Sequence, residues 1–100
     1  MYKLPKEVNI MGNIYKVIAC ETTLEVDPAK RVPLFGTIDF YERIIRIYAH
    51  ERSDFDLQQV LLHEILHGIT QELHLAIDEE VNDTLATVIL DTFIRNGLLK

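Results

Sequence analysis

The chain has 100 residues, a formal net charge of −6, 48% hydrophobic residues and 26% charged residues. This length and composition are typical of one globular domain. The Lys and Arg residues are scattered along an acidic chain, which argues against a nucleic-acid-binding surface. No apolar run approaches the roughly 18 residues of a membrane span, so we expect no membrane partner.

The expected compartment is the cytoplasm. Residues 1–7 lack the apolar segment of a signal peptide. Cys20 is the only cysteine, so no disulfide framework is expected, and a reducing environment suits the chain. We therefore expect a single cytoplasmic domain over residues 1–100. The sequence does not indicate the oligomeric state of this domain.

Two apolar stretches near the N-terminus, 8–10 and 15–19, flank Met11-Gly12-Asn13. Gly and Asn supply the positive φ angles that tight hairpin loops need, so we expect a β-hairpin here.

A second pair of strands is expected at 34–40 and 44–48, with a turn at 41–43, because both stretches are rich in β-branched and aromatic residues. Residues 26–33 contain two prolines and three charges without periodicity, which indicates a loop. The expected sheet thus has three or four short strands, antiparallel or mixed. Its last strand would lead directly into a helix.

The first helix is predicted from about residue 55 to residue 72. Ser53 and Asp56 have the spacing of a capping box at its start. Apolar residues cover most of its circumference, which indicates a largely buried helix with one polar stripe. Inside a helix, glycine is less favourable than alanine by about 1 kcal/mol, so we expect a specific reason for Gly68. That reason is either room for a substrate or close contact with a strand.

A second helix is predicted to begin after Asp78 and to stop at Asn96-Gly97. Its projection at 100° per residue places Glu79 and Asp83 within or beside the apolar arc. A carboxylate on a buried face is costly unless it is paired or bound to metal. Stabilisation of the helix dipole by Glu79, or a surface ion pair of Asp83, remains the alternative.

The polar stripe of the first helix carries the motif His63-Glu64-Ile65-Leu66-His67. A helix places two such imidazoles on one face, with about 5–6 Å between their Cβ atoms, so both can reach one metal ion. In a zincin site the two histidines bind Zn²⁺ and the intervening glutamate acts as general base. We therefore expect His63 and His67 to bind zinc and Glu64 to be catalytic.

A catalytic zinc site usually has three protein ligands. His74 is out of register with the extended metzincin pattern and is set aside. Antiparallel helices joined by a short link, with side chains leaning toward their own N-termini, favour a ligand a turn or more into the second helix. Asp83 is thus the preferred third ligand and Glu79 the second choice, and the carboxylate that does not ligate would orient a histidine.

These residues resemble a known family, the small phage and prophage metallopeptidases related to the ImmA/IrrE type. The likeness lies in residues 59–69 around the motif, in the strand pair at 35–40 and 45–47, and in the downstream Glu79-Glu80 and residues 83–86. The resemblance implies a minimal gluzincin-like zinc peptidase with a small sheet, a motif helix and a second helix that donates an acidic ligand. The family usually has a glutamate where this chain has Asp83.

The sequence thus predicts an α+β fold, with a small antiparallel or mixed sheet packed on a central motif helix and a second, C-terminal helix. The expected function is zinc-dependent hydrolysis of peptide bonds in a protein or peptide partner, with residues 44–48 as an edge strand that aligns the substrate. The alternative is a zinc-stabilised protein-interaction module without proteolytic activity. Substrate and cleavage preference stay open.

Overall fold

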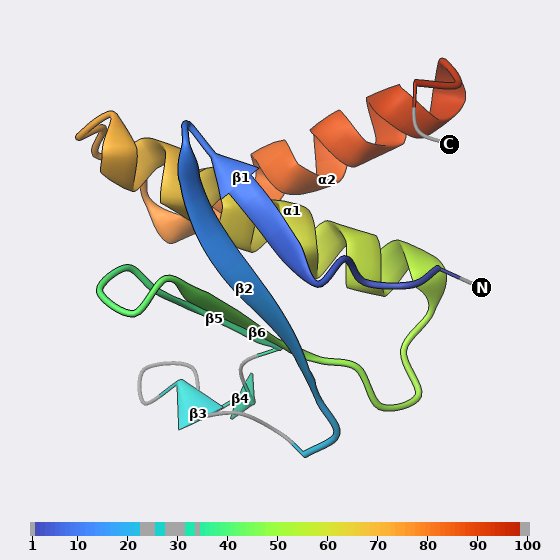
Figure 1. Ribbon diagram of the computed structural model, residues 1–100. Helices are drawn as coiled ribbons and strands as arrows, with labels where there is room; N and C mark the ends of the chain where they lie inside the picture. The colour runs from blue at the N-terminus through green and yellow to red at the C-terminus, as the bar shows by residue number, and fades with distance from the viewer. Residues whose placement is uncertain (1, 23–25, 28–31, 34, 99–100) are drawn as a thin grey trace.

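The computed structural model describes residues 2–22, 26–27, 32–33 and 35–98. It shows a four-stranded mixed sheet with two helices on one side of it (Figure 1), which confirms the predicted α+β fold. No helix within these ranges is long and apolar enough to cross a lipid bilayer.

The N-terminal hairpin is confirmed. Strands β1 (Glu7–Ile10) and β2 (Asn13–Cys20) pair antiparallel. Met11 and Gly12 form the turn with φ angles of 52° and 91°, and the Asn9 side chain accepts a hydrogen bond from the Gly12 amide at 2.7 Å. The positive φ angles match the right-handed twist of the flanking strands, which is why this turn closes the hairpin.

The second hairpin is also confirmed in its described part. Strands β5 (Gly36–Asp39) and β6 (Ile44–Tyr48) pair antiparallel. Asp39 Oδ1 accepts hydrogen bonds from the amides of Tyr41 and Glu42, both at 2.9 Å, and so organises the turn. Leu34, included in the prediction, lies outside the described residues.

The order of the sheet is β1-β2-β6-β5, and β6 runs parallel to β2. The prediction that residues 44–48 form an edge strand is therefore wrong: β6 is central and β5 lies at the edge. The physical reason is burial, because Ile45 and Ile47 of β6 are fully inaccessible to solvent. A strand with two such residues needs neighbours on both sides, which leaves the shorter, less buried β5 at the edge.

The predicted loop at 26–33 is only partly described. Strands β3 (Val26–Asp27) and β4 (Val32–Pro33) form a separate antiparallel pair of two residues each. The loop prediction is thus wrong for these four residues, and residues 28–31 lie outside the described part of the chain.

Both helix predictions hold to within a residue. Helix α1 (Asp54–Glu72) is capped by Ser53, whose side chain accepts a hydrogen bond from the Asp56 amide at 3.1 Å. Helix α2 (Glu79–Arg95) is capped by Asp78, whose carboxylate accepts from the Val81 amide at 2.8 Å. Gly97, with a φ angle of 62°, follows the last turn, as glycine commonly does at a helix C-terminus.

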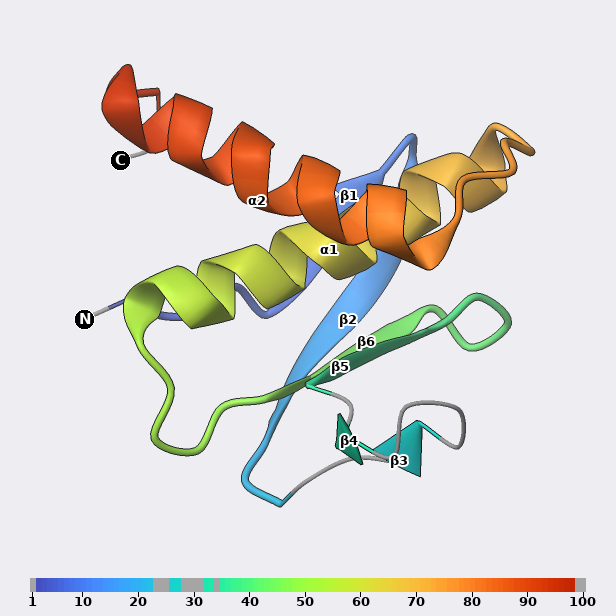
Figure 2. The same cartoon turned by 180° about the vertical axis from the view of Figure 1, so that it is seen from behind.

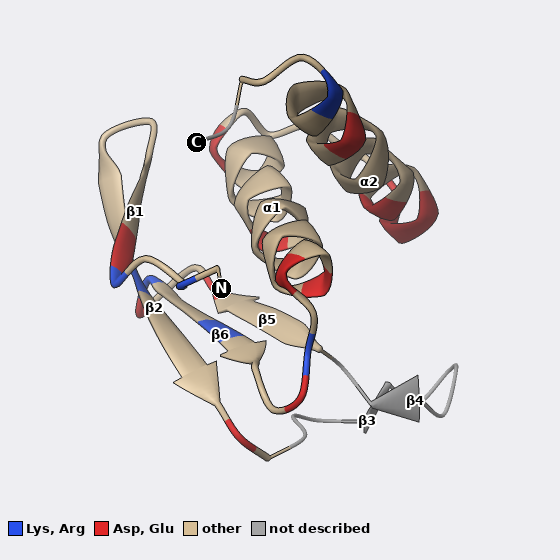
Figure 3. Ribbon diagram, turned by 90° about the vertical axis from the view of Figure 1, so that its right-hand side faces the viewer, with Lys and Arg blue, Asp and Glu red and all other residues tan. Residues whose placement is uncertain are grey.

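Helix α1 occupies the middle layer, between the sheet and α2 (Figures 2 and 3). The buried core lies at the contact between α1 and the sheet and consists of Ile10, Tyr15, Ile45, Ile47, Leu57, Val60 and Leu61. Helix α2 packs on α1 through Asn82, Ala86 and Leu90, and the two helices diverge toward the C-terminus of α2. Helix α1 thus packs on the sheet, and α2 packs on α1.

Gly68 lies on the face of α1 that meets the sheet. A methyl group placed on it would come within 2.6 Å of Ile10 Cδ1 and 3.4 Å of Ile38 Cδ1. Of the two reasons considered for this glycine, close contact with strands therefore applies.

Replacing Gly68 with valine should destabilise the fold by about 2 kcal/mol, because the added atoms overpack the contact with Ile10. Chemical denaturation would measure this loss. The same substitution in an Ile10→Ala background should cost clearly less, since the truncated side chain leaves room. Equal costs in the two backgrounds would contradict the packing explanation.

Candidate metal centre

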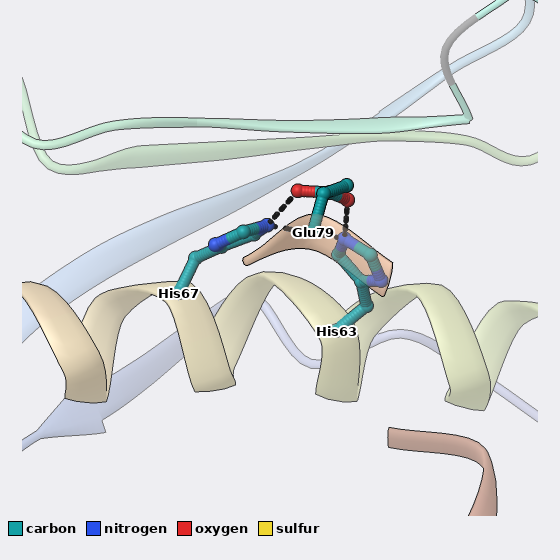
Figure 4. A group of neighbouring side chains, drawn as sticks. All are labelled: His63, His67 and Glu79. Carbon is teal, nitrogen blue, oxygen red and sulfur yellow. Dashed lines mark hydrogen bonds and ion pairs between the residues drawn. The ribbon is translucent and has the colours of Figure 1, made fainter. Parts of the chain in front are cut away.

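Three side chains from the two helices converge on one point (Figure 4). The Nε2 atoms of His63 and His67 are 3.1 Å apart. The carboxylate of Glu79 spans them, with Oε1 at 2.6 Å from His63 Nε2 and Oε2 at 2.9 Å from His67 Nε2. All three ligand atoms lie within 4.8 Å of one another, which is the arrangement of a candidate metal site.

The local structure explains this convergence. His63 and His67 are one turn apart on α1, so their side chains leave the helix on the same side. Glu79 is the first residue of α2, directly after the Asp78 cap. The short link 73–78 returns the chain beside α1, so the first turn of α2 reaches the two imidazoles. Helix capping at Asp78 therefore also places the third donor.

His63 meets a carboxylate at each of its ring nitrogens. Nδ1 lies 2.9 Å from Asp83 Oδ1, and Nε2 lies 2.6 Å from Glu79 Oε1. A neutral imidazole carries one proton and can donate to only one of them. The other nitrogen would then direct a lone pair at a carboxylate oxygen. The arrangement is favourable only when a positive centre, a proton or a metal ion, also occupies the space at Nε2.

The donors fit zinc. Bonds of about 2.0–2.1 Å to a tetrahedral ion place the donor atoms about 3.3 Å apart. The observed separations of 3.1, 2.6 and 2.9 Å are shorter, and the two Glu79 contacts use different carboxylate oxygens, so the side chains would have to move apart around an ion. Burial lowers the pKa of His67, although Glu79 opposes this shift, and the neutral imidazole that burial favours is the form that binds metal. Two imidazoles and one carboxylate are the donor set of a known class of catalytic zinc sites.

The sequence-based preference was Asp83 as the third ligand with Glu79 as the second choice, and this ligand assignment stays a prediction. The geometry favours Glu79 as the third donor and places Asp83 on the outer nitrogen of His63. The rotation of the His63 ring decides which nitrogen faces which carboxylate. The direction in which side chains lean along a helix does not predict that rotation. His74, set aside as a ligand, is exposed beyond the end of α1.

Glu64 is buried, with 5% of its surface exposed. Edge strand β5 passes directly over it: a methyl group on Gly36 would lie 2.9 Å from Glu64 Oε2 and 2.6 Å from Val60 Cγ1. The pKa of Glu64 is raised from 4.5 to about 7, chiefly by burial, while His63 opposes the rise and Glu79 adds to it. A carboxyl group with a pKa near neutrality is suited to accept and return a proton.

Two polar residues of the centre were not singled out in the sequence. Asn82 is 1% exposed, and its amide donates a hydrogen bond to the backbone carbonyl of His63 at 3.1 Å. Gln59 donates to Asp83 Oδ1 at 3.0 Å. The signal for Asn82 is a polar residue beside Ala86 on an apolar arc. The signal for Gln59 is its position one turn before His63 on the same stripe.

Comparisons with protein-family models, with curated proteins and with solved structures give no match. The case for a metal centre therefore depends on the geometry and chemistry of these residues.

The buried carboxyl of Glu64 should make the metal-free protein less stable as pH rises. Below about pH 4.5 it is protonated in both the folded and the unfolded chain. Between about pH 4.5 and 7 the unfolded chain ionises first, so the contribution of Glu64 becomes unfavourable by about 3 kcal/mol and stays so at higher pH. Glu64→Gln should therefore match the wild type near pH 4 and exceed its stability at pH 8.

Chemical denaturation in the presence of a chelator would measure this difference across the pH range. The exposed Glu42 offers a control, because Glu42→Gln should show the same pH dependence as the wild type. A stability difference for Glu64→Gln that does not change between pH 4 and 8 would show that the Glu64 carboxyl is not held in a costly environment.

Proposed function

We propose that this protein is a zinc-dependent peptidase that hydrolyses peptide bonds of a protein substrate. The observation that carries the proposal is the convergence of His63 Nε2, His67 Nε2 and the Glu79 carboxylate beside the buried Glu64. The resemblance of the motif and its surroundings to phage and prophage metallopeptidases supports the same function. We also propose that the protein is encoded by a phage or a prophage.

Zinc bound by His63, His67 and Glu79 would lower the pKa of a coordinated water toward about 7 and polarise a peptide carbonyl. Glu64 is one residue from His63, and His63 and Glu79 both influence its pKa. Its Oε2 atom would accept the proton of the attacking water and pass it to the leaving amine. Asp83 would keep the His63 proton on Nδ1, so that Nε2 presents its lone pair.

The substrate would bind along β5. This strand ends the sheet, so among the described residues one of its edges pairs with no strand. A peptide added to that edge as a further strand would pass Gly36, where the backbone touches Glu64. β5 replaces residues 44–48 in this role, because β6 is central. The free Cys20 is compatible with a reducing compartment, and we propose a cytoplasmic protein as the substrate.

Purified protein should bind one Zn²⁺ per chain, as measured by elemental analysis. His63→Ala should lose this zinc because a donor is removed. Glu79→Gln should weaken zinc binding more than Asp83→Asn does, since Glu79 contacts the metal position and Asp83 contacts the outer nitrogen of His63. Chelator competition would give the affinities. Absence of stoichiometric zinc would refute the metal centre, and a larger loss for Asp83→Asn would restore Asp83 as the ligand.

Glu64→Gln should abolish proteolysis while leaving zinc content and fold intact, because it removes the proton acceptor and preserves the ligands. The variant should also trap uncleaved substrate in a pull-down, and the trapped protein would then serve in cleavage assays. Glu42→Gln should cleave it like the wild type. If Glu64→Gln retains the full biological effect of the zinc-loaded wild type, the protein is a zinc-stabilised interaction module instead.

A further inference from the structure

A polar contact joins the two helices one turn before His63. The side-chain amide of Gln59 lies 3.0 Å from Asp83 Oδ1 and 3.4 Å from Thr87 Oγ1. The Thr87 hydroxyl itself donates to the backbone carbonyl of Asp83 at 3.2 Å. Its oxygen can therefore accept a hydrogen bond, and both N–H groups of Gln59 have a partner on α2.

Two side chains of α1 meet the same oxygen of Asp83. His63 Nδ1 is 2.9 Å from Oδ1, and Gln59 approaches this atom from one turn earlier on α1. Asp83 is 59% exposed at its side chain, so packing does little to orient its carboxylate. A second donor from the rigid helix α1 supplies the orientation that burial does not.

We propose that Gln59 is a positioning residue of the metal centre, which acts through Asp83 to hold the His63 ring with Nε2 toward His67 and Glu79. The inference rests on the proposed zinc site. Gln59 has no contact with the three donors in the described hydrogen-bond network, so its effect passes through the Asp83 carboxylate. Outer hydrogen-bond partners of metal-ligating histidines commonly change metal affinity tenfold or more.

Gln59 has a matched neighbour for a control. Gln58 precedes it on α1 and is also half-buried, but its position on the helix is rotated from that of Gln59 by one step of about 100°. Methionine has nearly the same length and flexibility as glutamine but no N–H donor. Gln59→Met thus removes the hydrogen bonds with little change in volume, and Gln58→Met reports the cost of the replacement itself.

The test is a double-mutant cycle on zinc affinity. Gln59→Met should raise the Kd for zinc about tenfold in the wild-type background. In an Asp83→Ala background the same substitution should change Kd less than about twofold, because the carboxylate that transmits the effect is gone. Gln58→Met should leave Kd unchanged in both backgrounds. The visible spectrum of the Co²⁺-substituted protein should shift for Gln59→Met and not for Gln58→Met.

A second readout does not depend on affinity. In the zinc-loaded wild type, the Nδ1–H proton of His63 should be protected from exchange with water in NMR spectra, and Gln59→Met should accelerate its exchange. A merely structural contact between the helices would lower the stability of the metal-free protein but leave Kd, spectrum and exchange unaltered, which overturns the inference. Equal losses of affinity in both Asp83 backgrounds also overturn it. A wild type without zinc refutes the proposed function itself, which is a separate result.

Discussion

The position of His63 between two carboxylates is the constraint on which the rest of the site depends. Asp83 and Glu79 lie on successive turns of α2 and meet opposite nitrogens of one imidazole. This places two negative groups within hydrogen-bond distance of a ring that, when neutral, offers a single proton. A cation at Nε2 resolves the conflict. The helices are therefore arranged so that α2 docks most favourably on α1 when positive charge lies between them.

Glu64 occupies an environment that costs the folded protein stability. A carboxyl group with 5% exposure under the backbone of β5 loses most of its hydration, and its pKa rises to about 7. An apolar side chain would fill that space at a lower cost. The close approach of Gly36 is a similar constraint, because any larger residue at this position would displace the side chain of Val60 or of Glu64. The two residues together place a buried carboxyl group with a pKa near neutrality at the sheet edge.

Local signals made most of the fold predictable. Ser53 and Asp78 begin the helices, Gly12 closes the first hairpin, and the spacing of His63 and His67 requires only a helix. The features that were mispredicted depend on distant parts of the chain. The central place of β6 follows from burial of Ile45 and Ile47 against α1 and β2, and no pattern within residues 44–48 distinguishes a central strand from an edge strand. Which carboxylate meets which nitrogen of His63 depends on the rotation of that ring, which the sequence does not specify.

The core between α1 and the sheet contains no residue of α2. Helix α2 nevertheless supplies Glu79 and Asp83 to the candidate centre, and it packs on α1 through its own buried residues Asn82, Ala86 and Leu90. Substitutions of Glu79 and Asp83, whose side chains are 55% and 59% exposed, can therefore change the charge around His63 without requiring the core between α1 and the sheet to be rebuilt. His63, Glu64 and His67 lie on α1, which packs on the sheet, so this half of the candidate centre is tied to the core while the carboxylates of α2 are not.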